Sequence, residues 1–311
     1  MMPARRPWGG PRLAAGLALL VLVSCGQAGA PGADGSDSGP VDGNAGRPAA
    51  PTEGVTATVV PPAAEPVPPP GSAPEAEPTA GPEPPAVSPA PEPPPVPAGL
   101  LGRDLERIPT DRRVVALTFD AGANADAVRP ILSTLAAERV TATFFLTGVF
   151  VKQFPSPSRS IAAAGHRLAN HSVSHPNFTS LSRTEIRDEV RGAERDIRDI
   201  TGGDPRPFFR FPFGDRDART IEAVNDLGYV AVRWTVDTLG WQGTSGGRSA
   251  AEVTERVLDT ARPGQIVLMH VGSHPTDGST LDADALPGMI AGLRAAGYDF
   301  VTLDALLEAG S

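Results

Sequence analysis

Two histidines, His171 and His175, stand four residues apart in a segment with the sequence Asn-His-Ser-Val-Ser-His. Imidazole nitrogens bind divalent cations such as zinc, so a pair at this spacing could hold one metal ion. Asp120 ends one apolar run of the chain and His270 ends another. Because a carboxylate accepts a proton and an imidazolium donates one, these two side chains could transfer protons beside the metal. The four residues together indicate a hydrolase.

Short apolar runs alternate with helical patterns in the second part of the chain. The apolar runs cover residues 114–119, 141–146, 167–169, 208–213, 229–236, 265–269 and 300–303. Helical spacing of apolar residues is found in 128–135, 183–200, 221–227, 251–258 and 286–293. Nearly continuous apolar runs are typical of buried parallel strands. The alternation predicts a parallel sheet wrapped by helices, either open or closed into a barrel.

Polar residues recur where the predicted strands end. Asp120, Asp237 and His270 each end a run, Arg210 lies within one, and His171 follows another. In β/α barrels the chemistry gathers at the carboxyl ends of the strands, so we expect these side chains to share one rim. Taken singly, each of these residues has a structural alternative. His171 and His175 could be surface or helix-capping residues, and Asp120 could cap a helix. Arg210 could form a structural salt bridge, and His270 could be a core residue packed at a strand end.

The first hundred residues have a different composition. Residues 31–97 contain 21 of the 35 prolines, nine acidic residues and one basic residue. Such a segment buries too little apolar surface to fold, so residues 26–100 are predicted to be a disordered, extended linker before a domain at 101–311. The linker carries most of the formal charge of −9, and no basic face suggests nucleic-acid binding.

Residues 1–25 resemble a bacterial lipoprotein signal peptide. Three arginines precede an apolar stretch at residues 13–23, and Cys25 is the only cysteine of the chain. The stretch is too short to span a bilayer comfortably. The resemblance implies lipidation of Cys25, which would anchor the protein outside the cell membrane and let the linker reach into the cell wall. An ordinary cleaved signal peptide is the alternative.

Residues 110–305 resemble the polysaccharide deacetylases of carbohydrate esterase family 4. The segments that match the family's five motifs, in order, are 118–122, 171–175, 210–214, 237–241 (loosely) and 268–270. The resemblance implies a distorted (β/α) barrel. It also implies that His171 and His175 are metal ligands and that Asp120 is the general base. Arg210 would pair with Asp120 and hold it ionised.

The resemblance assigns four further roles. His270 would be the general acid, and Asp237 would hydrogen-bond it and keep it protonated. Trp241 and Pro212 would contact the sugar, although Trp241 could equally be part of the core. The metal would be zinc, with cobalt or manganese as other possibilities.

One position departs from the family pattern. The first motif normally carries a second aspartate that is the third metal ligand, and here that residue is Ala121. A catalytic zinc site normally has three protein ligands. Asn124 or Asp126 could replace the missing ligand, and the charge favours Asp126. The alternative is that Asp126 caps the helix that follows it.

The sequence thus predicts a monomeric, metal-dependent deacetylase of a cell-wall or extracellular polysaccharide. Peptidoglycan amino sugars are the favoured substrate because of the predicted anchor, and chitooligosaccharide and O-acetylated xylan are alternatives. A different class is also open: a carbohydrate-binding lipoprotein that has lost catalysis together with its third ligand.

Overall fold

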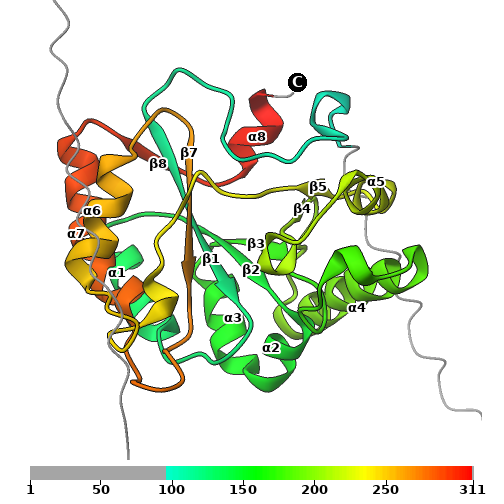
Figure 1. The fold of residues 1–311 in the computed structure, drawn as a ribbon, viewed down its shortest axis with the longest axis horizontal. Helices are drawn as coiled ribbons and strands as arrows, with labels where there is room; N and C mark the ends of the chain where they lie inside the picture. Colours follow the sequence, from blue (N-terminus) through cyan, green and yellow to red (C-terminus); the bar gives the residue numbers. More distant parts are fainter. Residues whose placement is uncertain (1–95, 310–311) are drawn as a thin grey trace, which may run out of the picture. The chain divides into compact units, whose positions relative to one another are not determined.

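The strand β1 (Val114–Ala121) runs through the middle of the fold (Figure 1). All eight of its residues are buried. The computed structural model describes residues 96–309. The other strands are β2 (Thr143–Leu146), β3 (Arg167–Asn170), β4 (Phe208–Phe209), β5 (Val230–Ala231), β6 (Val236–Asp237), β7 (Gln265–His270) and β8 (Asp299–Val301). The helices are α1 (Val128–Ala137), α2 (Gly148–Gln153), α3 (Pro155–Ala163), α4 (Arg183–Thr201), α5 (Ala218–Asp226), α6 (Ala250–Asp259), α7 (Leu281–Ala295) and α8 (Asp304–Ala309). The predicted alternation of strands and helices is confirmed.

All strand pairs are parallel. The order is β5-β4-β3-β2-β1-β7-β6, and β8 pairs with the first residues of β1. The register places Asp120 of β1 level with His270 of β7 and with Phe145 of β2. Carboxyl ends of parallel strands meet at one edge, so the predicted convergence of polar residues on one rim follows from this pairing.

The two edges of the sheet are joined by a bend at residues 232–235. The Val232 N–H donates to the Phe209 carbonyl on one side, and the Thr235 N–H donates to the Ile266 carbonyl on the other, both at 2.8 Å. The prediction of one strand over residues 229–236 is therefore wrong: the chain leaves the sheet after β5 and returns to its opposite edge as β6. The carbonyls of Val232 and Arg233, freed by the bend, accept hydrogen bonds from Arg210.

Alternate residues of β1 face opposite sides of the sheet, as the pleat requires. Val115, Leu117 and Phe119 belong to a large apolar cluster that includes residues of α1, α6 and α7. Ala116, between them, belongs to a separate inner cluster. Thr118 and Asp120 share the side of Ala116 by this alternation, which turns Asp120 toward the inside. Figure 1 shows α6 and α7 together at one flank of the strands and α4 and α5 at the other.

The N-terminal predictions mostly fall outside the described residues. The signal peptide at 1–25, Cys25 and the linker up to residue 95 all lie there. Leu100, just before the predicted start of the domain, is buried in the inner cluster with Leu105 and Ile108. None of the helices in residues 96–309 has the length and apolar character needed to cross a membrane.

Candidate active site

Arg210 and Asp120 form a buried ion pair at the carboxyl end of the strands. Nη1 of Arg210 donates to Asp120 Oδ1 at 2.7 Å, and Nη2 donates to the Thr118 hydroxyl at 2.9 Å. The guanidinium also lies over the ring of Phe145, 4.0 Å from its centroid. Burial by itself raises the pKa of the Asp120 carboxyl, but the charge and hydrogen bond of Arg210 hold that pKa below its ordinary value. The Asp120 carboxyl is therefore ionised near neutral pH and could accept a proton.

His171 presents one ring nitrogen to that carboxylate. Its Nδ1 lies 2.8 Å from the Arg210 carbonyl oxygen, and its Nε2 lies 3.4 Å from Asp120 Oδ2. Burial lowers the pKa of His171 to about 4, so the ring is neutral near pH 7. A carbonyl only accepts hydrogen bonds, so Nδ1 carries the proton and Nε2 has a free lone pair. This nitrogen and a carboxylate oxygen repel each other unless a cation lies between them.

His175 completes a pair of neutral imidazoles. The centroid of its ring lies 4.8 Å from that of His171, and burial also lowers its pKa. The two rings meet because Ser172 and His175 both adopt left-handed backbone conformations, with φ of 67° and 61°. Two neutral imidazoles beside an ionised carboxylate are a donor set that suits a divalent cation such as zinc.

The loop that carries the two histidines is held in place by hydrogen bonds and packing against α4 and α2. The Glu189 carboxylate of α4 accepts from the N–H groups of Val173 and Ser174, at 2.8 and 2.9 Å. The Val173 side chain packs against glycines of two helices. A Cβ added to Gly192 of α4 would lie 2.5 Å from Val173 Cγ2, and a Cβ added to Gly148 of α2 would lie 3.4 Å from Val173 Cγ1. The absence of two side chains therefore makes room for the loop.

His270 lies on the neighbouring strand, opposite Asp120 in the register. Burial alone lowers the pKa of His270, but the carboxylates of Asp282, Asp120 and Asp237 outweigh it and raise the pKa. Asp282 comes from α7, and its Oδ2 lies 3.6 Å from His270 Nδ1. Sequence reasoning missed Asp282, because no pattern in the chain connects α7 to this strand.

Asp237 does not hydrogen-bond His270 in the described structure. Its carboxylate accepts from the Leu239 N–H at 2.9 Å and from the Trp241 indole at 3.3 Å. The predicted partner of His270 is thus corrected: Asp237 acts on it only through its charge, because the turn after β6 draws this carboxylate back to its own loop.

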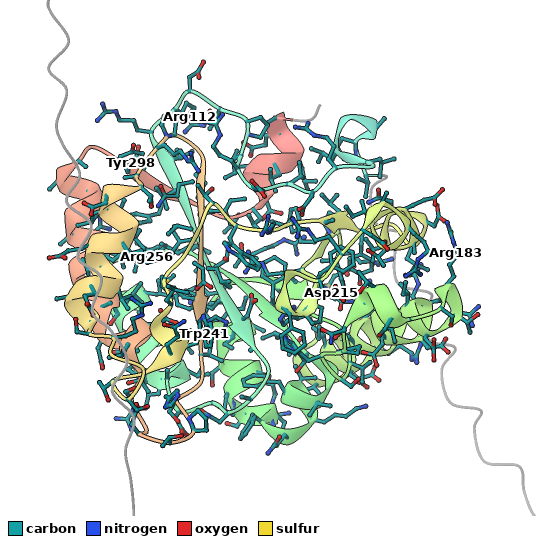
Figure 2. The ribbon with its side chains drawn as sticks, in the orientation of Figure 1. Arg112, Arg183, Asp215, Trp241, Arg256 and Tyr298 are labelled. Carbon is teal, nitrogen blue, oxygen red and sulfur yellow. The ribbon has the colours of Figure 1, made fainter. Side chains whose placement is uncertain are left out.

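Two aromatic side chains stand exposed beside these groups. Trp241 is 50% exposed and lies on the side of the strands where α6 and α7 are found (Figure 2). Phe213 is 70% exposed and packs edge-on against His175, with centroids 4.4 Å apart. Pro212, the predicted sugar contact, is buried, and the sequence did not single out its neighbour Phe213. Phe213 is turned outward by a left-handed backbone, with φ of 58°, which no local sequence pattern reveals.

Comparison with known proteins identifies relatives of this fold and site. The family model described as polysaccharide deacetylase matches residues 107–232. A peptidoglycan-N-acetylglucosamine deacetylase of Bacillus cereus is 34% identical over 200 residues, which cover 64% of this chain and 70% of that protein. The chain belongs to the polysaccharide deacetylase family.

Solved structures of the family agree with the fold. PdaA of Bacillus subtilis, a family 4 carbohydrate esterase, matches with a TM-score of 0.61 and 30% identity, over 67% of this chain and 86% of that one. BA3943 of Bacillus anthracis, described as a family 4 pseudoenzyme, matches with a TM-score of 0.59 and 30% identity, over 65% and 68%. The predicted fold class is confirmed as the parallel half-barrel of the polysaccharide deacetylase family, whose active members are hydrolases of carbon–nitrogen bonds.

Ala121 lies where the family resemblance predicts an aspartate as the third metal ligand. Ala121 is fully buried in the apolar cluster beneath the helices. The alternative ligand Asp126 is exposed, and its Oδ2 accepts a hydrogen bond from the Ser273 hydroxyl at 2.6 Å. Asn124 accepts from the Ser273 N–H in the same small network. Within residues 96–309, no group of three His, Cys, Asp or Glu side chains is arranged to hold a metal ion. Metal coordination by the two imidazoles and by Asp126 therefore stays a prediction.

Proposed function

We propose that this chain hydrolyses the N-acetyl groups of peptidoglycan amino sugars in a metal-dependent reaction. The observation that carries the proposal is the approach of the neutral His171 Nε2 to Asp120 Oδ2 at 3.4 Å. A cation between those atoms would remove their repulsion and would place an ionised base next to the metal. Peptidoglycan is favoured because the similar Bacillus cereus protein is named for that substrate.

Each side chain of the site has a part in this reaction. Bound zinc would polarise the acetyl carbonyl and make water acidic enough to lose a proton near neutral pH. His171 and His175 would hold the ion, with Asp126 as the proposed third ligand after a change of rotamer. Asp120, held ionised by Arg210, takes a proton from the attacking water. His270 gives a proton to the amine nitrogen as the bond to the acetyl carbon breaks.

Trp241 and Phe213 would bind the sugar. Both rings are exposed. Phe213 packs on His175, and Trp241 follows β6, which pairs with the strand of His270. Flat rings stack on the apolar faces of sugar rings and bury that surface from water. We place Pro212 beneath Phe213 as support rather than as a direct contact.

The site would work outside the cell. The arginine-rich start, the short apolar stretch and Cys25 favour lipid anchoring to the membrane, and the proline-rich segment would carry the domain into the wall. If this proposal is correct, the Cys25→Ala variant should incorporate no labelled lipid and should no longer be retained at the membrane.

Acetate release tests the proposal directly. The purified chain is incubated with peptidoglycan, chitooligosaccharide and acetylated xylan, each with added Zn²⁺, Co²⁺ or Mn²⁺ and with a chelator. We expect release from peptidoglycan that the chelator abolishes, and a drop of about 10²–10⁴-fold in Asp120→Asn. Release from xylan alone would replace the N-deacetylase proposal by O-deacetylation.

A second candidate is a wall protein that binds carbohydrate without turnover. Ala121 favours it, as does the likeness to the pseudoenzyme BA3943. Binding of peptidoglycan fragments with no acetate under any of the three metals would establish this candidate. The Arg210–Asp120 pair and the raised pKa of His270 favour catalysis, since binding alone has no use for a general acid.

A further inference from the structure

Asp282 is a buried carboxylate next to His270 that the proposed reaction does not yet use. It lies in the first turn of α7 and is 4% exposed. Its Oδ2 accepts from the His270 N–H at 2.8 Å, and its Oδ1 accepts from the Thr238 hydroxyl at 2.6 Å. These two bonds fix both oxygens, so the carboxylate has a single orientation between β7 and the turn after β6.

The chain makes room for this carboxylate at Gly240. A Cβ on residue 240 would lie 2.4 Å from Asp282 Oδ1 and 2.7 Å from its Cγ. Gly240 is not among the glycines with positive φ, so its backbone conformation is open to any residue. The glycine is therefore required by space alone. Asp282 occupies the position that a side chain of residue 240 would otherwise fill.

The His270 ring has a nitrogen without a hydrogen-bond partner, and Asp282 is placed to supply one. Among the described residues, His270 Nδ1 is a buried atom with no hydrogen bond. Asp282 Oδ2 lies 3.6 Å away, which is too long for a hydrogen bond but within reach of a small rotation of the ring. Catalytic hydrogen bonds are often long before substrate binds. Protonation of the ring would draw the two groups together.

We propose that Asp282 is a positioning residue that holds the His270 imidazole by Nδ1, so that Nε2 faces the leaving amine, and that Gly240 is present to admit it. This proposal rests on the proposed function of His270 as general acid. The charged groups that face His270 are Asp282 from α7, Asp120 from β1 and Asp237 from β6. Of these, only Asp282 contacts both the main chain and the ring of His270.

A purely structural role would give a different outcome. Asp282 could serve only to cap the His270 and Thr238 donors and to place a negative charge at the start of α7. An asparagine at 282 keeps an oxygen that accepts such bonds but removes the charge. Asp284, in the same turn of α7 but exposed, offers a matched control, since Asp284→Asn removes the same charge far from any bond to His270.

The experiment compares the full chain with Asp282→Asn, Gly240→Ala and Asp284→Asn. The imidazole titrations of the five histidines are followed by NMR without substrate, with His270 assigned from His270→Gln. We expect the midpoint of His270 to fall by about one pH unit in Asp282→Asn. The His270 midpoint should also fall in Gly240→Ala, where the Asp282 charge remains but the new methyl group displaces it. Asp284→Asn should titrate like the parent. The basic limb of the acetate-release profile should move with the same midpoint.

The readouts separate two kinds of failure. If the parent releases no acetate, the proposed function fails, while the NMR midpoints still test Asp282. If His270 titrates alike in the parent and in Asp282→Asn, the positioning role is overturned. Should Asp282→Asn fail to fold, Gly240→Ala provides the same measurement, and an unchanged midpoint there has the same meaning.

Discussion

Asp120 and His270 are paired residues in the register of two adjacent parallel strands, β1 and β7. Neighbouring strands lie about 4.8 Å apart, so a base and an acid fixed at one level can act on the same small group. Their partners favour opposite charges on the two residues. Arg210 holds the Asp120 carboxyl ionised, and Asp282 lies beside the His270 imidazole, whose pKa is raised. The sheet fixes the spacing, and the side-chain partners fix the protonation.

Loss of Arg210 should destabilise the fold as well as the site. Arg210→Met leaves the buried Asp120 carboxylate unpaired and the carbonyls of the bend at 232–235 without their donor. We expect the free energy of unfolding to fall by about 3–5 kcal/mol, measured by urea denaturation. Arg183→Met, at the start of α4 beside α5 (Figure 2), removes two exposed ion pairs, with Glu222 and Asp226, and should cost about 1 kcal/mol or less. Equal losses in the two variants would contradict the role of Arg210.

Acid should destabilise the metal-free protein through His171. The pKa of His171 is about 4 in the folded chain and 6.5 ordinarily, so the unfolded chain binds more protons between those values. Stability therefore rises with pH across that window, by about 3 kcal/mol for this residue alone. Urea denaturation in chelator at steps from pH 7 to pH 4 measures the slope. His171→Gln should flatten it; an unchanged slope would mean that the ring is not buried neutral.

Gly192→Ala should loosen the loop that holds the two imidazoles. The new Cβ would lie 2.5 Å from Val173 Cγ2, so Val173 must move and the loop with it. We expect a loss of about 1–3 kcal/mol in stability and weaker binding of Zn²⁺ by titration calorimetry. Gly288→Ala in α7 is the control, because its Cβ meets Thr254 at an ordinary 3.6 Å and a helix gains from alanine. Equally tight zinc binding in both variants would show that the packing of Val173 does not hold the loop of His171 and His175 in place.

Ala121→Asp should make stability depend on metal. Position 121 is fully buried among apolar groups, so an unpaired carboxylate there is costly. If the new carboxylate reaches the ion held by His171 and His175, added Zn²⁺ should raise the free energy of unfolding by about 2.7 kcal/mol when zinc exceeds Kd a hundredfold. The parent should respond less, because it has one ligand fewer. A variant that zinc fails to rescue would show that residue 121 faces away from the metal.

Several features of the protein follow from the order of residues alone. The alternation of apolar runs and helical stripes predicts a parallel sheet wrapped by helices, because period and burial are local properties of the chain. Residues that end such runs must meet at one rim, which is why the positions of Asp120, His171, Arg210 and His270 along the chain are enough to group them. The spacing of His171 and His175 likewise predicts the imidazole pair.

Other features were decided only by the tertiary structure. Residues 229–236 have the pattern of one strand, yet they divide between opposite edges because Arg210 satisfies the carbonyls of the bend. Asp282 reaches His270 from a helix that follows later in the chain, through a space left by Gly240. Phe213 faces outward because of a left-handed backbone. Contacts between distant segments depend on how the elements pack in three dimensions, and local spacing along the chain carries no record of that packing.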